Sequence, residues 1–196
     1  MIPDELLEQY KARKSEVKQN EMVFMEGEQA HYYWQVLSGS IKMVNYSEEG
    51  QEFAQGMFGP GESFGEPPLF TDVDYPSNAV AITDSYLWKL PKSSFLQLLK
   101  DNFDLHLKIT GTLCQRLYYK ATIMKEISSH APEHRILTLI DLLKEKNTQD
   151  GDEYEVPFTR QQLADMTGLR VETVIRSIKA LEKQGKLKIV NRKVYR

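Results

Sequence analysis

The sequence predicts an α+β protein with an N-terminal antiparallel β-roll, a long helix and a C-terminal winged helix-turn-helix. Three observations support this fold class. Residues 14–92 consist of short segments in which apolar and polar residues alternate, separated by Gly and Pro. Residues 103–128 contain no Pro and a single Gly. Two amphipathic segments flank the turn Thr167-Gly168-Leu169. Short alternating segments are typical of strands, and a long uninterrupted segment is typical of a helix. The expected parts are residues 1–92, 93–130 and 131–196.

Composition places the chain among ordinary globular proteins. Of its 196 residues, 41% are apolar and 27% are charged, a balance typical of soluble domains. No apolar run approaches the roughly 20 residues that span a bilayer, and the acidic start at Met1–Tyr10 lacks the apolar stretch of a secretory signal. A single cysteine, Cys114, excludes an intramolecular disulfide and an all-cysteine metal site. We expect a cytoplasmic protein with no membrane partner and no bound metal.

A short helix over the first ten residues precedes the strands. Its apolar side chains Leu6, Leu7 and Tyr10 lie on one side. Alternating residues then predict Met22–Met25, Tyr33–Leu37, Ile41–Tyr46, Gln51–Phe58, Ala79–Ile82 and Tyr86–Leu90 as strands. Many short strands separated by Gly- and Pro-containing turns are typical of an antiparallel roll or barrel.

After Pro91 the apolar spacing becomes helical. Ser93–Lys100 predicts a short helix, with Ser93 or Ser94 as its N-cap. Residues 103–128 predict a helix roughly 39 Å long at 1.5 Å per residue. A single small domain rarely needs such a long helix. The apolar residues on its faces indicate which surfaces it packs against.

Two apolar stripes run along this long helix. One has the spacing of a coiled-coil seam and contains Phe103, Leu107, Thr110, Cys114, Leu117, Ala121, Met124 and Ser128. The other contains Leu105, Ile109, Leu113, Ile123 and Ile127. We expect one stripe to face the roll and the other to face the same helix of a second chain, because both must be covered. The alternative is one wide core-facing helix in a monomer.

The net charge is unevenly distributed along the chain. Residues 1–130 carry a net charge of −6, residues 131–196 carry +3, and residues 156–196 alone carry +7. A basic segment on an acidic body is typical of a local polyanion-binding module.

This basic segment contains the helix-turn-helix pattern. Glu133–Lys146 predicts a helix that precedes it. Thr159 and Gln162 have the spacing of a capping box at the start of the next helix. A second amphipathic helix runs from Arg170 or Val171 to Gln184. Two short strands joined by Asn191-Arg192 then predict a wing with a basic tip.

Glu172 and Arg176 lie on one side of the first two turns of the second helix, where a recognition helix meets base edges. Arginine matches the two acceptors of guanine, and a carboxylate accepts from the amino group of cytosine. We expect these two residues to pair with each other while reading a G·C base pair. A plain surface ion pair is the alternative. Backbone or flanking contacts are expected from Thr159, Arg160, Gln161, Arg170, Val171, Thr173, Lys179, Arg192 and Lys193.

The sequence resembles the family of the cyclic-AMP receptor protein and the fumarate–nitrate reduction regulator (CRP/FNR) along nearly its whole length. The most specific stretches are Thr159–Ala164, Gly168–Arg176 and Leu181-Glu182. Leu37-Ser-Gly39, Gly59-Pro-Gly61 and Phe64-Gly-Glu66 resemble turns of the family's roll, which is like a cyclic-nucleotide-binding domain. The resemblance implies a transcription regulator that binds palindromic operators as a homodimer and contacts RNA polymerase, with Glu172 and Arg176 at the two base-contacting positions.

The chain departs from its cyclic-nucleotide-binding relatives at the effector pocket. Those relatives have a phosphate cassette, a segment that carries a glutamate and, about ten residues later, an Arg-Ser or Arg-Ala pair. Here Gly65 and Glu66 stand in the cassette, and the later pair is Pro76-Ser77. Counting back from the shared arginine, Arg135, places Lys120 and Ala121 where the cyclic-AMP receptor contacts the base. We therefore expect a degenerate pocket at Gly65, Glu66, Ser77, Lys120 and Ala121, in which Glu66 supports the turn. The cysteines of an iron–sulfur cluster are also absent.

Charge supports the same expectation. No Lys or Arg lies between Lys42 and Lys89. Burying a phosphodiester without a cation costs several kcal/mol. We therefore expect no cofactor and no binding of cyclic AMP.

Three further interpretations stay open. A metalloenzyme is not expected, because His31 is the only histidine in the roll and cannot form a three-histidine site. A small-ligand sensor whose C-terminal domain binds protein is the alternative function. For Cys114 a redox role is weighed against a small buried apolar residue, which we favour. For Tyr32, Tyr33 and Trp34 a ligand cavity is weighed against alternating core and surface packing, which we also favour.

Overall fold

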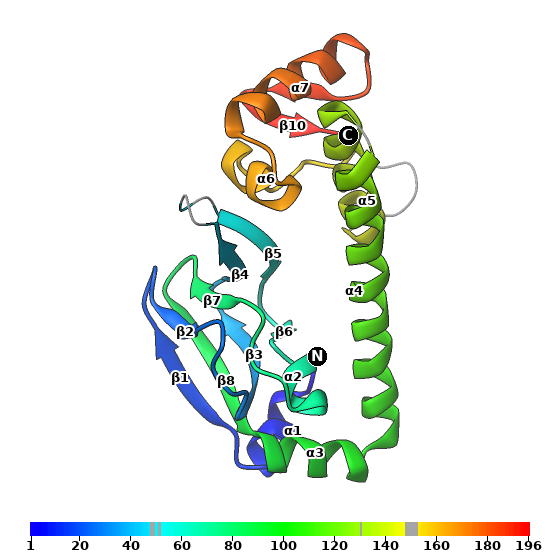
Figure 1. The fold of residues 1–196 in the computed structure, drawn as a ribbon. Helices are drawn as coiled ribbons and strands as arrows, with labels where there is room; N and C mark the ends of the chain where they lie inside the picture. Colours follow the sequence, from blue (N-terminus) through cyan, green and yellow to red (C-terminus); the bar gives the residue numbers. More distant parts are fainter. Residues whose placement is uncertain (48–49, 51, 130, 148–152) are drawn as a thin grey trace. The chain divides into compact units, whose positions relative to one another are not determined.

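The computed structural model comprises two compact units, Met1–Leu113 and Cys114–Arg196 (Figure 1). It describes residues 1–196 except 48, 49, 51, 130 and 148–152, and the side chains of the rest except 123, 126–129, 146 and 147. The boundary between the units falls within one long helix. The three-part division expected from the sequence therefore stays a prediction. In the part that the structure describes, no helix is both long and apolar enough to cross a membrane.

The first unit is a β-roll. A short helix, α1 (Asp4–Gln9), precedes eight strands: β1 (Arg13–Val17), β2 (Met22–Phe24), β3 (Tyr32–Ser38), β4 (Ile41–Tyr46), β5 (Glu52–Phe58), β6 (Ser63–Phe64), β7 (Asn78–Ala81) and β8 (Ser85–Pro91). They form two antiparallel four-stranded sheets, in the orders β1-β8-β3-β6 and β2-β7-β4-β5. Apolar side chains from both sheets form one core. The predicted fold class is confirmed for this half of the chain.

β3 is covered on both faces. Tyr33, Trp34, Gln35 and Val36 are buried in succession, so the expected alternation of core and surface residues is wrong here. The Gln35 side chain satisfies the buried backbone of Ile2, since its Oε1 accepts from Ile2 N at 2.8 Å and its Nε2 donates to Ile2 O at 2.9 Å. Because neither face of this stretch of β3 meets water, the period-two signal is absent here.

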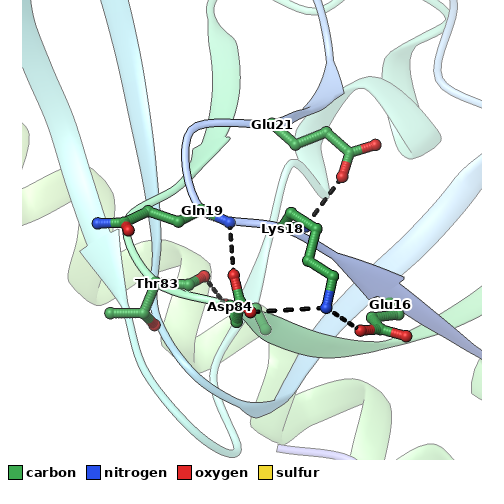
Figure 2. Close-up of polar contacts among 7 residues, drawn as sticks. Glu16, Lys18, Gln19, Glu21, Thr83 and Asp84 are labelled. Atoms are coloured by element: carbon green, nitrogen blue, oxygen red, sulfur yellow. Dashed lines mark hydrogen bonds and ion pairs between the residues drawn. The ribbon is translucent and has the colours of Figure 1, made fainter.

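Polar contacts fix the turn after β1 against the turn between β7 and β8 (Figure 2). Gln19 N donates to Asp84 Oδ1 at 2.9 Å, and Lys18 Nζ lies 3.5 Å from Asp84 Oδ2. The backbone hydrogen bond from Gln19 is the main reason why the pKa of Asp84 is lowered. These contacts are exposed, so they set the turn geometry more than the stability.

Three elements of this unit are not predicted by the sequence: β1, β6 and the short helix α2 (Pro67–Thr71). The next helix, α3 (Lys92–Asp101), begins directly after β8, with Pro91 at the N-cap and no side-chain cap. The expected Ser93 or Ser94 cap is therefore wrong. Pro91 has a fixed φ that suits the start of a helix, and a backbone carbonyl takes one N–H of the first turn, since Lys92 N donates to His31 O at 2.8 Å.

The long helix, α4, covers Phe103–Ser129, as predicted within one residue. On the second stripe, Ile109 is buried in the core of the roll, with Leu105 and Leu113 packed against it. On the seam, the exposed large apolar side chains are Phe103, Leu107, Leu117 and Met124, and Tyr118 beside them is also exposed. Cys114, also on the seam, is exposed in the single chain, so its expected role as a small buried residue at the seam stays a prediction. Ile123, Ile127 and Ser128 lie outside the described side chains.

After α4, the described residues of the second unit form three helices and a hairpin: α5 (Pro132–Asn147), α6 (Arg160–Thr167), α7 (Val171–Lys183), β9 (Lys188–Val190) and β10 (Lys193–Tyr195). Residues 154–156 extend the hairpin, since Val156 N donates to Val194 O at 2.9 Å and Tyr154 N donates to Arg196 O at 2.8 Å. Apolar side chains of α5, α6, α7 and β10 are buried. The predicted winged helix-turn-helix is confirmed.

Candidate nucleic-acid interface

The start of α6 is fixed by the predicted capping box. Thr159 Oγ1 accepts from Gln162 N at 3.1 Å, and Gln162 Oε1 accepts from Thr159 N at 2.8 Å. At the other end Gly168 adopts a φ of 65°, a left-handed conformation that glycine tolerates. These two signals hold the turn that sets the direction of α7.

α7 buries one face and exposes the other. Val174, Ile178 and Leu181 are buried, and Ser177 Oγ donates to Glu133 Oε1 of α5 at 3.3 Å. The opposite face presents a set of exposed residues: Glu172, Ile175, Arg176 and Lys179. Val171, the first residue of α7, and Thr173 are half-buried beside this face. The helix therefore presents to solvent the residues expected to read DNA.

Glu172 and Arg176 form no ion pair with each other in the free protein. Arg176 Nη2 instead lies 3.5 Å from Thr173 Oγ1, and the described ion pairs include none between Arg176 and Glu172. Two exposed charges gain little from pairing in water. Both side chains are thus available to an external partner.

The wing is a two-residue hairpin whose tip carries charge. Asn191 and Arg192 have φ angles of 50° and 69°, as a tight hairpin turn with the right-handed strand twist requires. Arg160 Nη2 donates to Arg192 O at 3.3 Å, which joins the start of α6 to the wing. Both residues line the same groove.

A groove of about 590 Å³ lies between α7, the start of α6 and the wing. Four of its lining residues are cationic: Arg160, Lys179, Arg192 and Lys193. Thr159, Ile175 and Glu155 also line it, whereas Glu172 and Arg176 lie outside the lining. The other lining residues are apolar, namely Val156, Pro157, Phe158, Ile178, Ile189 and Val194. The four cations are the part of this groove that suits a phosphate backbone.

The remaining predicted contacts are peripheral. Arg170 occupies the N-cap of α7 without a capping hydrogen bond and is exposed. Gln161 is exposed, but its Nε2 donates to Asp165 Oδ1 at 2.8 Å. Arg170 is therefore directed to solvent, and the hydrogen bond of Gln161 uses only one of the two N–H groups of its amide.

Lys193 has a partner that the sequence did not suggest. Its Nζ lies 2.6 Å from Glu155 Oε1, and Tyr195 OH donates to Glu155 Oε2 at 3.0 Å. The hydrogen bond with Lys193 lowers the pKa of Glu155, and the same bond raises the pKa of Lys193. The ion pair is therefore fully formed at pH values between the usual carboxylate pKa and the lysine pKa. It is lost as the pH falls through the lowered pKa of Glu155. At neutral pH, Glu155 competes with any phosphate for Lys193.

Replacing Glu155 with glutamine should strengthen DNA binding. An exposed ion pair contributes about 0.2–1 kcal/mol, so we expect affinity to rise by about 1.4- to fivefold per half-site at low salt. The slope of log K against log salt should steepen by up to about 0.9 per half-site, because Lys193 then releases a counterion.

The matched control for this experiment is Glu153→Gln. It removes the same charge but releases Lys188, which lies 3.0 Å from Glu153 and outside the groove lining. Fluorescence anisotropy over a salt series distinguishes the two variants. Equal gains would show that net charge alone matters, and no gain for Glu155→Gln would remove Lys193 from the interface.

In the roll, the expected effector pocket is closely packed. Gly65 has a φ of 71°, and a Cβ there would lie 2.8 Å from the Phe24 ring. Glu66 is buried at the N-cap of α2 and accepts a hydrogen bond from Ser63 Oγ. Ser77 is 1% exposed, and its Oγ has no hydrogen-bond partner. Lys120 and Ala121 lie on α4 in the second unit.

Aromatic rings cover this region. The rings of Phe24 and Tyr75 stack with centroids 3.6 Å apart, and Phe64 lies 6.0 Å from Phe24. Burial raises the pKa of Tyr75 to about 12. The groups of the cassette are thus a glycine, a carboxyl, a hydroxyl and stacked rings, with no cation among them. This set does not fit the phosphodiester of a cyclic nucleotide. Among the described residues no cluster of three or more metal-binding side chains occurs.

Known proteins show the same arrangement. Residues 14–102 match the cyclic nucleotide-binding domain family, and residues 134–195 match the Crp-like helix-turn-helix domain. The chain is 29% identical over 162 residues to the cAMP-activated global transcriptional regulator CRP of Haemophilus influenzae, covering 81% of this chain and 72% of that one. It is 26% identical over 172 residues to the Cyclic AMP receptor protein of Thermus thermophilus, covering 87% and 77%.

Solved structures agree at the level of the fold. CLP of Xanthomonas campestris, described as a c-di-GMP responsive global regulator, is similar with a TM-score of 0.76, 21% identity and 98% coverage of both chains. A CooA mutant of Carboxydothermus hydrogenoformans is similar with a TM-score of 0.82 and 16% identity, covering 100% of this chain and 86% of that one.

Fold and helix-turn-helix together define a DNA-binding transcription regulator with a cyclic nucleotide-binding-like domain, and not an enzyme. The chain belongs to the CRP/FNR family.

Proposed function

We propose that this regulator acts as a homodimer that recognises palindromic DNA operators in a sequence-specific manner. The exposed face of α7, with Glu172 and Arg176 free of each other above a cationic groove, is the observation that carries the proposal. Arg176 reads a guanine, Glu172 accepts from a cytosine, and Arg192 and Lys193 hold phosphates. Thr159, Arg160, Gln161, Arg170, Val171, Thr173 and Lys179 make flanking contacts.

Dimer formation follows from the seam of α4. Large apolar side chains on a helix exposed in one chain are covered when the same stripe of a second chain packs on them. Leu117 and Met124 are 69% and 71% exposed, far more than such side chains usually are. A twofold dimer presents two α7 helices to successive major grooves, so we expect half-sites one helical turn apart. By family, the half-sites contain TGA-like cores, and the bound dimer contacts RNA polymerase in the cytoplasm.

We also propose that the roll of this protein has lost cyclic-nucleotide binding. Its cassette offers no cation, and the carboxyl of Glu66 is buried and accepts a hydrogen bond from Ser63 Oγ. The one hydroxyl without a hydrogen-bond partner there, Ser77 Oγ, cannot neutralise a full negative charge.

Selection of bound sequences from a random DNA pool tests both the sequence-specific DNA binding and the loss of cyclic-nucleotide binding. We expect a palindrome to be enriched, and the same sequences and bound fraction with or without about 1 mM cyclic AMP. A pool without enrichment in either arm would contradict sequence-specific binding and favour a C-terminal domain that binds protein. Enrichment that depends on cyclic AMP would refute the loss of the effector site.

A further inference from the structure

The groove between α7, the start of α6 and the wing has an apolar base. Val156, Ile178 and Val194 line the groove and are buried. Phe158 and Ile189 also line it and are half-buried. A DNA backbone is held through its charged phosphate oxygens, so these apolar side chains make no favourable contact with it. The groove therefore has a surface that the proposed DNA binding does not use.

The size and lining of the groove are those of a small-molecule site. Its volume is about 590 Å³, within the range of roughly 300–1,000 Å³ for such sites. Small-molecule sites are mostly apolar, with a few polar groups that fix the orientation of the ligand. A ligand that fits this groove has an apolar body and an anionic group that binds a cation of the lining.

Arg160 is the cation of the lining best placed to orient such a ligand. Its side chain is half-buried, and burial lowers the pKa of its guanidinium, which still stays charged at neutral pH. Arg160 Nη2 donates to the backbone oxygen of Arg192 at 3.3 Å, and no ion pair among the described residues includes Arg160. Lys193, in contrast, is paired with Glu155. Since a guanidinium has five N–H donors, Arg160 keeps donors for a ligand.

A carboxylate is the group that matches this guanidinium. Its two oxygens accept two parallel N–H donors, and such charge-assisted hydrogen bonds are roughly twice as strong as neutral ones. We propose that the groove binds a small molecule with one carboxylate on an apolar body, with the carboxylate on Arg160 and the body against the apolar base. The bound molecule covers the cations that hold phosphates and so excludes DNA. The exclusion of DNA rests on the proposed function, whereas the binding of the ligand does not.

Isothermal titration calorimetry of the full chain with octanoate tests the binding. We expect a Kd at or below about 1 mM. Affinity should rise by up to about fourfold for each methylene group from acetate through hexanoate to octanoate, because each methylene leaves water. Octanol has the same apolar body without the charge and should bind at least about tenfold more weakly.

The variant Arg160→Gln tests the position of the carboxylate. It should weaken octanoate binding by at least about tenfold, and since glutamine is a good helix former, α6 should stay folded. Arg170→Gln is the matched control. It removes an exposed arginine of the same unit that lies outside the groove lining, and it should bind octanoate as the parent does.

Octanoate should also compete with the selected operator. With octanoate at ten times its Kd, operator affinity measured by anisotropy should fall by about tenfold or more. Acetate at the same concentration adds the same ionic strength and should change the affinity by less than about twofold. In Arg160→Gln the two salts should have the same effect.

The outcomes separate this inference from the function beneath it. Octanoate that does not bind, that binds no more tightly than acetate, or that binds Arg160→Gln as well as the parent would overturn the site. Binding without any loss of operator affinity would overturn it too, because a ligand in this groove lies where phosphates are held. If the protein selects no operator, the proposed function fails, and calorimetry still decides the ligand site.

Discussion

The double variant Leu117→Glu, Met124→Glu should be monomeric and should lose operator binding by at least about 100-fold. Both positions lie on the exposed seam of α4, seven residues apart, so in a twofold dimer four carboxylates would meet in an apolar interface. Burying unpaired charges costs several kcal/mol each. Since each half-site would then bind alone, the second half-site would no longer contribute to affinity. Analytical ultracentrifugation and anisotropy measure the two effects.

A control variant adds the same charges away from the seam. Gln115→Glu with Thr122→Glu has the same seven-residue spacing on α4 but lies outside the seam stripe. It should remain dimeric and bind DNA with little change. A parent protein that sediments as a monomer at micromolar concentration would contradict the dimer.

Arg176→Ala should cost about 1–3 kcal/mol in operator binding, or roughly 5- to 150-fold in affinity. The guanidinium has an exposed position and a single long contact to Thr173 Oγ1 at 3.5 Å, so the loss would not come from unfolding. Preference should relax at one G·C pair in each half-site and stay unchanged at the others. Repeating the sequence selection with the variant measures this.

Lys179→Ala serves as the comparison on the same helix. It lines the groove and should weaken binding to all sequences alike while reducing the salt slope. An Arg176→Ala protein that keeps both its affinity and its selectivity would show that α7 does not dock as we propose.

The parts of this fold that depend on local signals were predictable. α4, α6 and α7 have uninterrupted apolar spacing or a capping pattern, and the hairpin turn at Asn191-Arg192 is recognisable from its residues. β6 and α2 were not predicted because β6 has two residues and α2 opens with two prolines. In β3, four consecutive residues are buried, so the alternation of apolar and polar residues that marks a strand is absent. These elements are determined by packing across the roll.

The same contrast holds for the candidate site. The exposed face of α7 follows from helical periodicity. The contact between Glu155 and Lys193 joins residues 38 apart in sequence, and the stack of Phe24 on Tyr75 joins residues 51 apart. Neither has a local sequence pattern, because each depends on how distant strands align. Glu172 and Arg176 are close in sequence but form no ion pair in the free protein, where exposed charges gain little from pairing. Their pairing while reading a base pair stays a prediction.

The wing tip has a consequence for how this family member can change. Arg192 occupies left-handed backbone, where a glycine would rest without strain and a side chain costs of the order of 1 kcal/mol. Substitution by glycine would relax the hairpin and delete a cation from the groove at the same time. At this position, a residue that relieves the backbone strain removes the side chain that would contact a phosphate. A search for more thermostable descendants of this protein would tend to find wings that hold DNA less well.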